Sequence, residues 1–220
     1  WKSLCPDPWL LLTGHFSPPP AQSAPADILG YRQQHLGKNL SVSYQKPLTM
    51  LRGWRQYLFD DTGRRYLDTV NNVAHVGHEH PRVVRAGQRQ MAVLNTNTRY
   101  LHHNIVRFTE ELLQTFPPAL NVAFLVNSGS EANELAMRLA KNYTGRQDMI
   151  VVEAGYHGNT QGCVDISSYK FDGPGGKGAP AWVQVTPIPD ACRGVHRENT
   201  AETGKKYAAH VGAAIQDRKS

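Results

Sequence analysis

The pattern of apolar and polar positions changes near residue 120. The first half predicts helices and strands in no regular alternation, with helices at residues 26–39, 80–94 and 104–116, a strand at 40–44 and a hairpin at 54–70. The second half alternates short apolar runs with helical stretches, giving strands at 121–126, 148–153 and 182–188 and helices at 130–143, 158–167 and 201–218. Strands separated by helices of this length predict an α/β fold with a mostly parallel sheet.

Composition divides the chain into three parts. Residues 1–26 are rich in proline and predict a linker or extended arm. Residues 27–95 carry the hairpin, where "DDTG" forms the turn between two alternating apolar runs. Residues 96–220 contain the strand–helix alternation. We therefore expect an arm, a segment built on a hairpin, and a domain of alternating strands and helices.

Charge and cysteine content narrow the class of protein. The chain has 220 residues and a net charge of +6, and its basic pairs, at 64–65 and 205–206, are short and lack interleaved aromatic residues. This composition argues against nucleic acid as a partner. No apolar run is long enough to cross a bilayer, so no membrane partner is expected. Three widely spaced cysteines indicate a reducing compartment, and we expect the cytoplasm.

The stretch "VNSGSEANELAMRLAK", residues 126–141, predicts an anion site at the start of a helix. Ser128 and Glu131 have the spacing of a capping box, and Gly129 lets the backbone approach a ligand closely. The free N–H groups of a first helical turn, together with the helix dipole, favour an anion. The alternative is a well-capped helix without a ligand. The stretch is not a Walker loop, because no Gly-Lys-Ser/Thr follows at the required spacing.

Several motifs in the right order resemble one family. "NSGSEANELAMRLAK" is followed by "EAGYHGNT", and upstream lies "YLFDDTGRRYLDTVNNVAHVGHEHPRVVRA". Together they resemble the class III aminotransferases, which are fold-type I enzymes dependent on pyridoxal 5'-phosphate. The resemblance covers residues 27–216. It implies a partial fold of that type, in which an N-terminal small-domain segment precedes the start of the cofactor-binding large domain.

The resemblance also implies roles for particular residues. The SGS turn (Ser128, Gly129 and Ser130) would bind the cofactor phosphate. In the YHG loop, Tyr156 would stack on the pyridine ring, which suits an aromatic face, while His157 would lie beside the ring and Gly158 would leave room for it. The alternative for Tyr156 is an ordinary core tyrosine. For Glu131 and Asn133 we favour capping and helix-packing roles over catalysis.

The substrate is less closely defined. "NTNTRYLHHN" and "DISSYKFDGPGGKGAPAWVQVTPIPDACRG" resemble the branch that contains phospho-lyases acting on phosphoethanolamine, although Ser168 stands where that branch has proline. Some transaminases place an arginine for a substrate carboxylate where this chain has Asn159. We take Tyr44, Arg99 and Asn159 as candidate substrate residues. Amino-group transfer from a small-molecule amine, phosphate elimination, and a noncatalytic phosphate-binding module all remain open.

A pyridoxal enzyme also needs a lysine for the cofactor aldehyde and a carboxylate for the ring nitrogen. None of the lysines stands in a setting that resembles the family's Schiff-base lysine. The resemblance places both features beyond Ser220. We therefore expect no catalytic residue of this kind in the chain, and no turnover by the chain alone. Family members are dimers, which implies a homodimer for the full-length enzyme.

A histidine cluster offers a competing hypothesis. "HVGHEHP" contains His75, His78 and His80, and imidazoles at short spacing can converge on zinc. However, Glu79 is the one carboxylate between them, and no cysteine stands at zinc spacing. The family resemblance assigns the same stretch to a loop near the cofactor, so we expect no metal.

Overall fold

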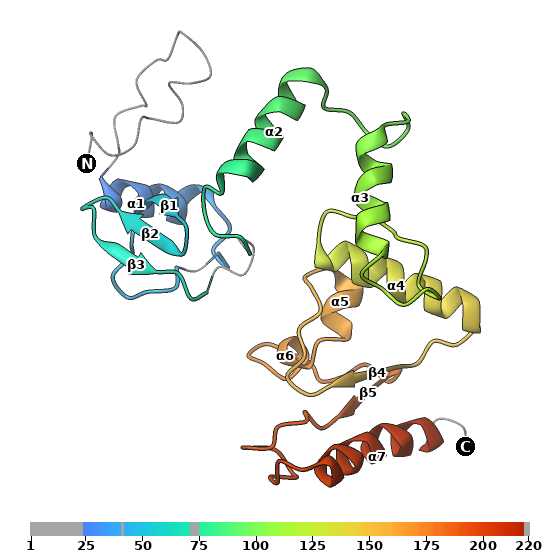
Figure 1. The fold of residues 1–220 in the computed structure, drawn as a ribbon. Coiled ribbons are helices and arrows are strands. Elements are labelled where there is room, and N and C mark those ends of the chain that lie inside the picture. The colour runs from blue at the N-terminus through green and yellow to red at the C-terminus, as the bar shows by residue number, and fades with distance from the viewer. Residues whose placement is uncertain (1–23, 41, 71–74, 218–220) are drawn as a thin grey trace. The chain divides into compact units, whose positions relative to one another are not determined.

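The computed structural model describes residues 24–40, 42–70 and 75–217, and its fold is drawn in Figure 1. The chain divides into two compact units, Trp1–Tyr100 and Leu101–Ser220. The predicted proline-rich arm lies outside the described residues up to residue 23. In the part of the chain that the structure describes, no helix is both long and apolar enough to cross a membrane.

The first unit is a small antiparallel sheet with two helices. Its elements are α1 (Pro25–His35), β1 (Met50–Trp54), β2 (Tyr57–Asp60), β3 (Arg65–Leu67) and α2 (Pro81–Val93). The strands lie in the order β1-β2-β3, with Tyr57 opposite Leu67 across the second pair. The predicted hairpin and both predicted helices are confirmed. Pro81 opens α2, where its missing N–H is no loss.

One carboxylate organises the turn between β2 and β3. Oδ1 of Asp60 accepts hydrogen bonds from the Thr62 hydroxyl at 2.7 Å and from the N–H groups of Thr62 and Arg64 at 2.9 Å, and Oδ2 accepts from the Tyr66 hydroxyl. Gly63 supplies the positive φ of +83°. The Thr62 hydroxyl and then the Tyr66 hydroxyl are the main donors that lower the pKa of Asp60 from 3.8 to about 2.

The second unit alternates helices with a parallel pair of strands. Its elements are α3 (His103–Leu113), α4 (Gly129–Thr144), β4 (Met149–Val152), α5 (Gln161–Asp165), α6 (Ser168–Phe171), β5 (Val183–Thr186) and α7 (Ala201–Asp217). β4 and β5 pair in parallel, with Val151 opposite Val185. The predicted helices that correspond to α3, α4, α5 and α7 and the predicted strands that correspond to β4 and β5 are confirmed, whereas the short helix α6 was not predicted.

Two predicted strands do not form. Residues 121–126 are assigned to no strand, and Val122 and Phe124 are 73% and 62% exposed. Residues 42–44 of the predicted strand at 40–44 are also unpaired, and residue 41 lies outside the described part of the chain. An apolar pattern becomes a strand only when another strand accepts its backbone hydrogen bonds. Neither segment has such a neighbour among the described residues.

The core of the second unit lies under the parallel pair. It is a cluster of buried apolar side chains from α4, β4, α5, α6 and β5, with Ile166 between the two short helices: Met137, Val151, Cys163, Ile166, Phe171 and Val183. Figure 1 shows α5 between α4 and the strands, and α7 beside β5. This packing fixes where the loop after β4 meets the start of α4.

Candidate active site

The first turn of α4 is capped by its own side chains. Ser128 is the N-cap, and its Oγ accepts from the N–H of Glu131 at 3.1 Å. The Glu131 carboxylate reaches back and accepts from the N–H of Asn127 at 2.6 Å. The predicted capping pair is confirmed, although Glu131 reaches one residue beyond the N-cap. This pair is a structural role for Glu131, as the sequence predicted.

The same turn leaves donors available for a ligand. An α-helix offers no carbonyl to its first N–H groups, and Ser128 Oγ takes up only that of Glu131. The N–H groups of Gly129 and Ser130 therefore point outward at the positive end of the helix dipole. A Cβ built on Gly129 would meet no heavy atom within 4 Å, so the space beside Gly129 is open.

The YHG loop (residues 156–158) packs against this turn and is hydrogen-bonded to it. Gly158 has φ +141°, and a Cβ there would lie 2.5 Å from Ser130 Oγ and 2.9 Å from Ser130 Cα. The N–H of Asn159 donates to Ser130 Oγ at 3.1 Å, and Nδ2 of Asn133 donates to the His157 carbonyl at 2.7 Å. The structure thus brings Ser130, Gly158 and Asn159 together, and it gives Asn133 the packing role that the sequence predicted.

The other side of the loop is tied to the core. The N–H of His157 donates to Ser167 Oγ at 2.9 Å, and the Ser167 hydroxyl in turn donates to the Cys163 carbonyl. Ala154 has φ +59°, in the left-handed region that non-glycine residues rarely occupy, and it turns the chain sharply after β4. Strain of this kind persists where the surrounding contacts fix the backbone, as they do here.

Two buried polar atoms beside the loop have no hydrogen-bond partner. They are Nδ1 of His157 and Oγ1 of Thr160, the N-cap of α5. A buried polar group left without a partner is costly, and most such groups in native proteins are paired. The hydrogen bonding around the YHG loop is therefore incomplete at these two atoms.

Tyr156 is not a core residue. Its side chain is 56% exposed, so the alternative prediction of an ordinary core tyrosine is wrong. The ring of Tyr169 meets it edge-on, with centroids 6.0 Å apart, and the Lys170 ammonium lies 5.5 Å from its centroid. Such cation–π and edge-to-face contacts hold an aromatic ring in one orientation. One face of Tyr156 is therefore supported by protein.

Sequence reasoning did not single out Tyr169 and Lys170 as site residues. With Glu153, Ala154 and Ser168 they line a cavity of about 540 Å³ beside the loop after β4. The signal was present in "SSYKFDG", where an aromatic residue and a cation stand together in a short polar segment. Periodicity could not find them, because α6 is only four residues long.

The remaining predicted substrate residues lie in the first unit. Tyr44 is exposed, and the N–H of Arg99 donates to Oδ1 of Asn97 at 3.1 Å. Their assignment to a substrate stays a prediction. Asn159, by contrast, adjoins the SGS turn through its backbone.

The histidine cluster is used differently. Nε2 of His78 lies 2.7 Å from Oδ2 of Asp68, and a Cβ on Gly53 would collide with the His78 ring. His78 therefore packs against the small sheet. Across the described residues, no three histidine, cysteine, aspartate or glutamate side chains are grouped so that they could hold a metal ion.

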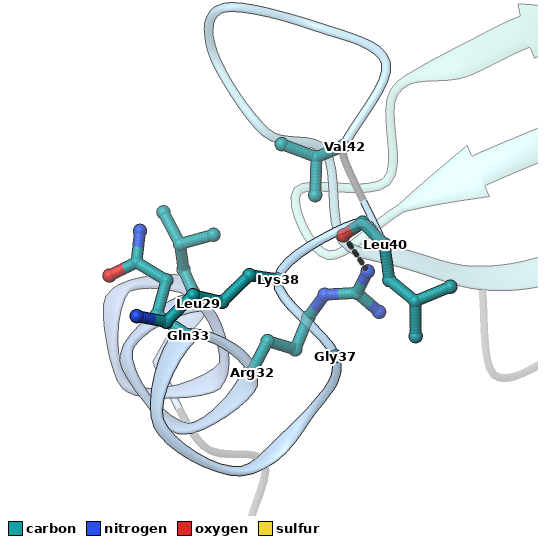
Figure 2. A pocket seen from close by; sticks show the side chains of 7 residues that line it. All are labelled: Leu29, Arg32, Gln33, Gly37, Lys38, Leu40 and Val42. Carbon is teal, nitrogen blue, oxygen red and sulfur yellow. Dashed lines mark hydrogen bonds between the residues drawn. The ribbon is translucent and has the colours of Figure 1, made fainter. Parts of the chain in front are cut away.

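The first unit contains a cavity of about 500 Å³. Figure 2 shows the guanidinium of Arg32 bonded to the Leu40 carbonyl at 3.2 Å. Among the residues that the structure describes, its lining is made of apolar, amide and cationic side chains and one glycine: Leu29, Arg32, Gln33, Gly37, Lys38, Leu40 and Val42. The SGS turn and the YHG loop, which offer free N–H groups and hydroxyls, are the better candidate site.

Comparison with known proteins matches residues 40–218 to the family model described as aminotransferase class-III. The chain is 47% identical over 199 residues to an alanine–glyoxylate aminotransferase 2-like protein of Drosophila melanogaster, covering 89% of this chain and 40% of that protein. It is 39% identical over 204 residues to ethanolamine-phosphate phospho-lyase homolog 1 of Caenorhabditis elegans, covering 88% and 44%. Relatives also include mitochondrial proteins of Arabidopsis thaliana and Homo sapiens.

This chain is also similar to solved structures. A phospholyase from Arthrobacter, determined in complex with phosphoethanolamine, matches with a TM-score of 0.76 and 37% identity. The match covers 86% of this chain and 44% of that one. Transaminases of lower identity share the fold, among them a taurine:2-oxoglutarate aminotransferase from Bifidobacterium kashiwanohense at a TM-score of 0.75 and 18% identity. The chain spans less than half the length of these relatives.

Proposed function

The chain belongs to the class III aminotransferase family, and from this premise we propose that it carries the phosphate- and ring-binding part of an enzyme that uses pyridoxal 5'-phosphate to act on a small-molecule amine. The main support for this proposal is the contact between the YHG loop and α4. The YHG loop is held against the open first turn of α4 by Gly158, Asn159 and Asn133.

The residues present fit a phosphorylated pyridine. The N–H groups of Gly129 and Ser130 are open to a phosphate, and Ser130 Oγ keeps its own hydrogen after accepting from Asn159. The hydroxyl of Ser128 likewise accepts in the helix cap and retains a hydrogen to donate.

The chain's residues would divide the work in the following way. The SGS turn binds the phosphate, and Tyr156 offers its exposed face to the ring while Tyr169 and Lys170 support the tyrosine. Gly158 keeps the loop close to Ser130, where any side chain would collide. When bound, pyridoxal phosphate supplies an electron sink for the carbon that bears the substrate amine.

Amino-group transfer to a carbonyl acceptor is the reaction we propose first, supported by the 47% identity to the aminotransferase 2-like protein. Phosphate elimination from a phosphorylated amine is the second candidate. It is favoured by the 37% identity to a phospholyase structure that holds phosphoethanolamine, and by an asparagine at position 159. Tyr44, Arg99 and Asn159 remain our candidates for contacts with the substrate.

Three further parts of the proposal concern the whole protein. We propose that the lysine for the cofactor aldehyde is not one of the lysines in this chain, that the full-length enzyme is a homodimer, and that it works in a reducing, cytoplasmic compartment. Among the cysteines that the structure describes, Cys163 and Cys192 are both free, which supports a reducing compartment.

A titration of the purified chain tests cofactor binding. Pyridoxal phosphate should quench tyrosine fluorescence at a lower concentration than pyridoxal, because only the first has a phosphate for the SGS turn. Tyr156→Ala should weaken binding of both compounds, and Tyr143→Ala, an exposed tyrosine at the far end of α4, is the matched control. Equal binding of the two compounds would refute the phosphate site.

Two assays then separate the alternatives. Borohydride reduction of the cofactor complex followed by peptide mapping should find no modified lysine in this chain. The full-length enzyme, given phosphoethanolamine, would release inorganic phosphate if it is a lyase. Given an amine and a keto acid, it would exchange the amino group if it is a transaminase. Cofactor binding without either activity would identify the noncatalytic phosphate-binding module.

A further inference from the structure

The cavity of about 500 Å³ in the first unit shares no residue with the candidate active site. Its volume is within the range of about 300–1,000 Å³ that is usual for small-molecule sites. Of the described residues that line it, those from Leu29 to Lys38 precede residues 40–218, which match the class III family model. The cavity is therefore built largely from a segment that the family model does not include.

The end of α1 and the turn after it fix the position of one cation in this cavity. The N–H of Leu36 donates to the Arg32 carbonyl at 3.0 Å, and the N–H of Leu40 donates to the Gly37 carbonyl at 2.9 Å. This turn brings the Leu40 carbonyl to the Arg32 side chain, whose Nη2 donates to it at 3.2 Å (Figure 2). The guanidinium is thus held before a ligand arrives, which lowers the entropy cost of binding.

The lining of the cavity is positively charged. Arg32 and Lys38 are the charged side chains among the described residues that line it. None of the ion pairs in the described part of the chain includes either of them. A guanidinium has five N–H donors, and the Leu40 carbonyl takes up one, so a pair of parallel donors remains for a planar oxyanion. The charge and the donors of this lining therefore suit an anion.

Aliphatic side chains supply much of the remaining lining. Leu29 is half-buried, whereas Leu40 and Val42 are 58% and 43% exposed. A ligand that covers these side chains removes apolar surface from water, which is favourable. A phosphate monoester carries about 1.5–2 negative charges at neutral pH. Placing it beside aliphatic side chains therefore costs more than placing a singly charged carboxylate there.

We propose that this cavity binds a small carboxylate with a short aliphatic chain. The carboxylate accepts two parallel hydrogen bonds from the Arg32 guanidinium, and the aliphatic chain lies against Leu29, Leu40 and Val42. Lys38 adds a second positive charge to the lining and strengthens the attraction without fixing the ligand's orientation. This site is separate from the SGS turn and does not depend on the binding of pyridoxal phosphate.

Titration of the isotopically labelled full chain with hexanoate, without pyridoxal phosphate, tests the site through its backbone amide resonances. Arg32→Gln should weaken hexanoate binding at least about tenfold, because hydrogen bonds to a charged group are the strong ones. Arg32→Lys keeps the charge without the parallel donors and should weaken binding less. Lys38→Gln should weaken it only a few-fold, since its side chain is exposed. Arg89→Gln, at an exposed arginine of α2, is the matched control.

Ligands of the same chain length supply the second comparison. Hexanol and hexylamine lack the negative charge and should bind at least about tenfold more weakly than hexanoate, and hexyl phosphate should also bind more weakly. Tighter binding of hexyl phosphate would overturn the assignment to a carboxylate. The proposal is also overturned if hexanoate shifts the resonances of Gly129 and Ser130 instead of those between Leu29 and Leu40, or if the Arg32→Gln variant binds hexanoate as tightly as the wild type.

Discussion

The two segments on either side of α4 are both apolar in sequence, but only one of them forms a strand. Residues 121–126, "NVAFLV", lead into the helix and form no strand, whereas β4, "MIVV", follows it and pairs with β5. Val122 is 73% exposed and Val151 is 6% exposed. Composition cannot explain this difference, since both segments are equally apolar. A partner strand and a covering core decide which segment is ordered.

The difference extends to the loops that follow each segment. After β4 the YHG loop is held by Ser130, Asn133 and Ser167. After residues 121–126 the chain enters the SGS turn, where Ser128 and Glu131 form a local cap and Ser130 takes part in the tertiary bond to the YHG loop. The YHG loop is thus fixed by tertiary contacts, and the cap at Ser128 by contacts within a few residues. Substitutions should therefore affect the two sides unequally.

The largest effect is expected on the tertiary side, for Gly158→Ala. The new Cβ would collide with Ser130, and alanine is strained at φ +141°. Overpacking and backbone strain each cost about 1–3 kcal/mol, so the free energy of unfolding should fall by roughly 2–6 kcal/mol. Urea unfolding measures this change. Gly212→Ala, in open space on α7, is the control and should cost nothing.

Next comes the direct test of the two apolar segments. Val151→Ala should lower the free energy of unfolding by about 2–3 kcal/mol, because it removes buried methyl groups and leaves a cavity. Val122→Ala should change it by less than about 0.5 kcal/mol, as for other exposed positions. Equal effects in urea unfolding would show that residues 121–126 are packed in solution. That result would contradict the difference described between this segment and β4.

A smaller effect is expected on the local side of the site. Ser128→Ala removes the acceptor for the N–H of Glu131 and should cost about 1 kcal/mol, the usual value for an N-cap. Ser128→Asp should restore stability, because aspartate caps as well as serine. Melting temperatures of the three proteins check this order. A neutral Ser128→Ala substitution would mean that the cap does not hold the turn.

The smallest effect concerns the hairpin of the first unit and depends on pH. The pKa of Asp60 is lowered to about 2, so its ionised form is favoured by folding. Its contribution is complete above the unfolded pKa near 4 and is lost as the pH falls toward 2. Amide resonances of Thr62 and Arg64 should follow this loss, and Asp60→Asn should remove the pH dependence. An unchanged pH profile in that variant would contradict the assignment.

Local signals in the sequence predicted much of the fold. Capping chemistry identified the start of α4, and the turn residues identified the hairpin, because both depend on neighbours a few positions away. The prediction of a strand at 121–126 was wrong because strand pairing depends on a partner that is distant in the sequence. Lys170 and Tyr169 were missed for a related reason. Only the folded chain places α6 beside Tyr156, and no period marks a helix of four residues.

We expect the SGS turn to bind a phosphate next to the YHG loop. The most direct measurement is the backbone amide spectrum of the isotopically labelled chain during titration with pyridoxal phosphate. We predict that the N–H resonances of Gly129 and Ser130 shift most, in the direction expected for strong hydrogen bonds to an anion. Inorganic phosphate should produce weaker shifts at the same residues. Resonances of Gly129 and Ser130 that stay unchanged while the cofactor binds elsewhere would contradict it.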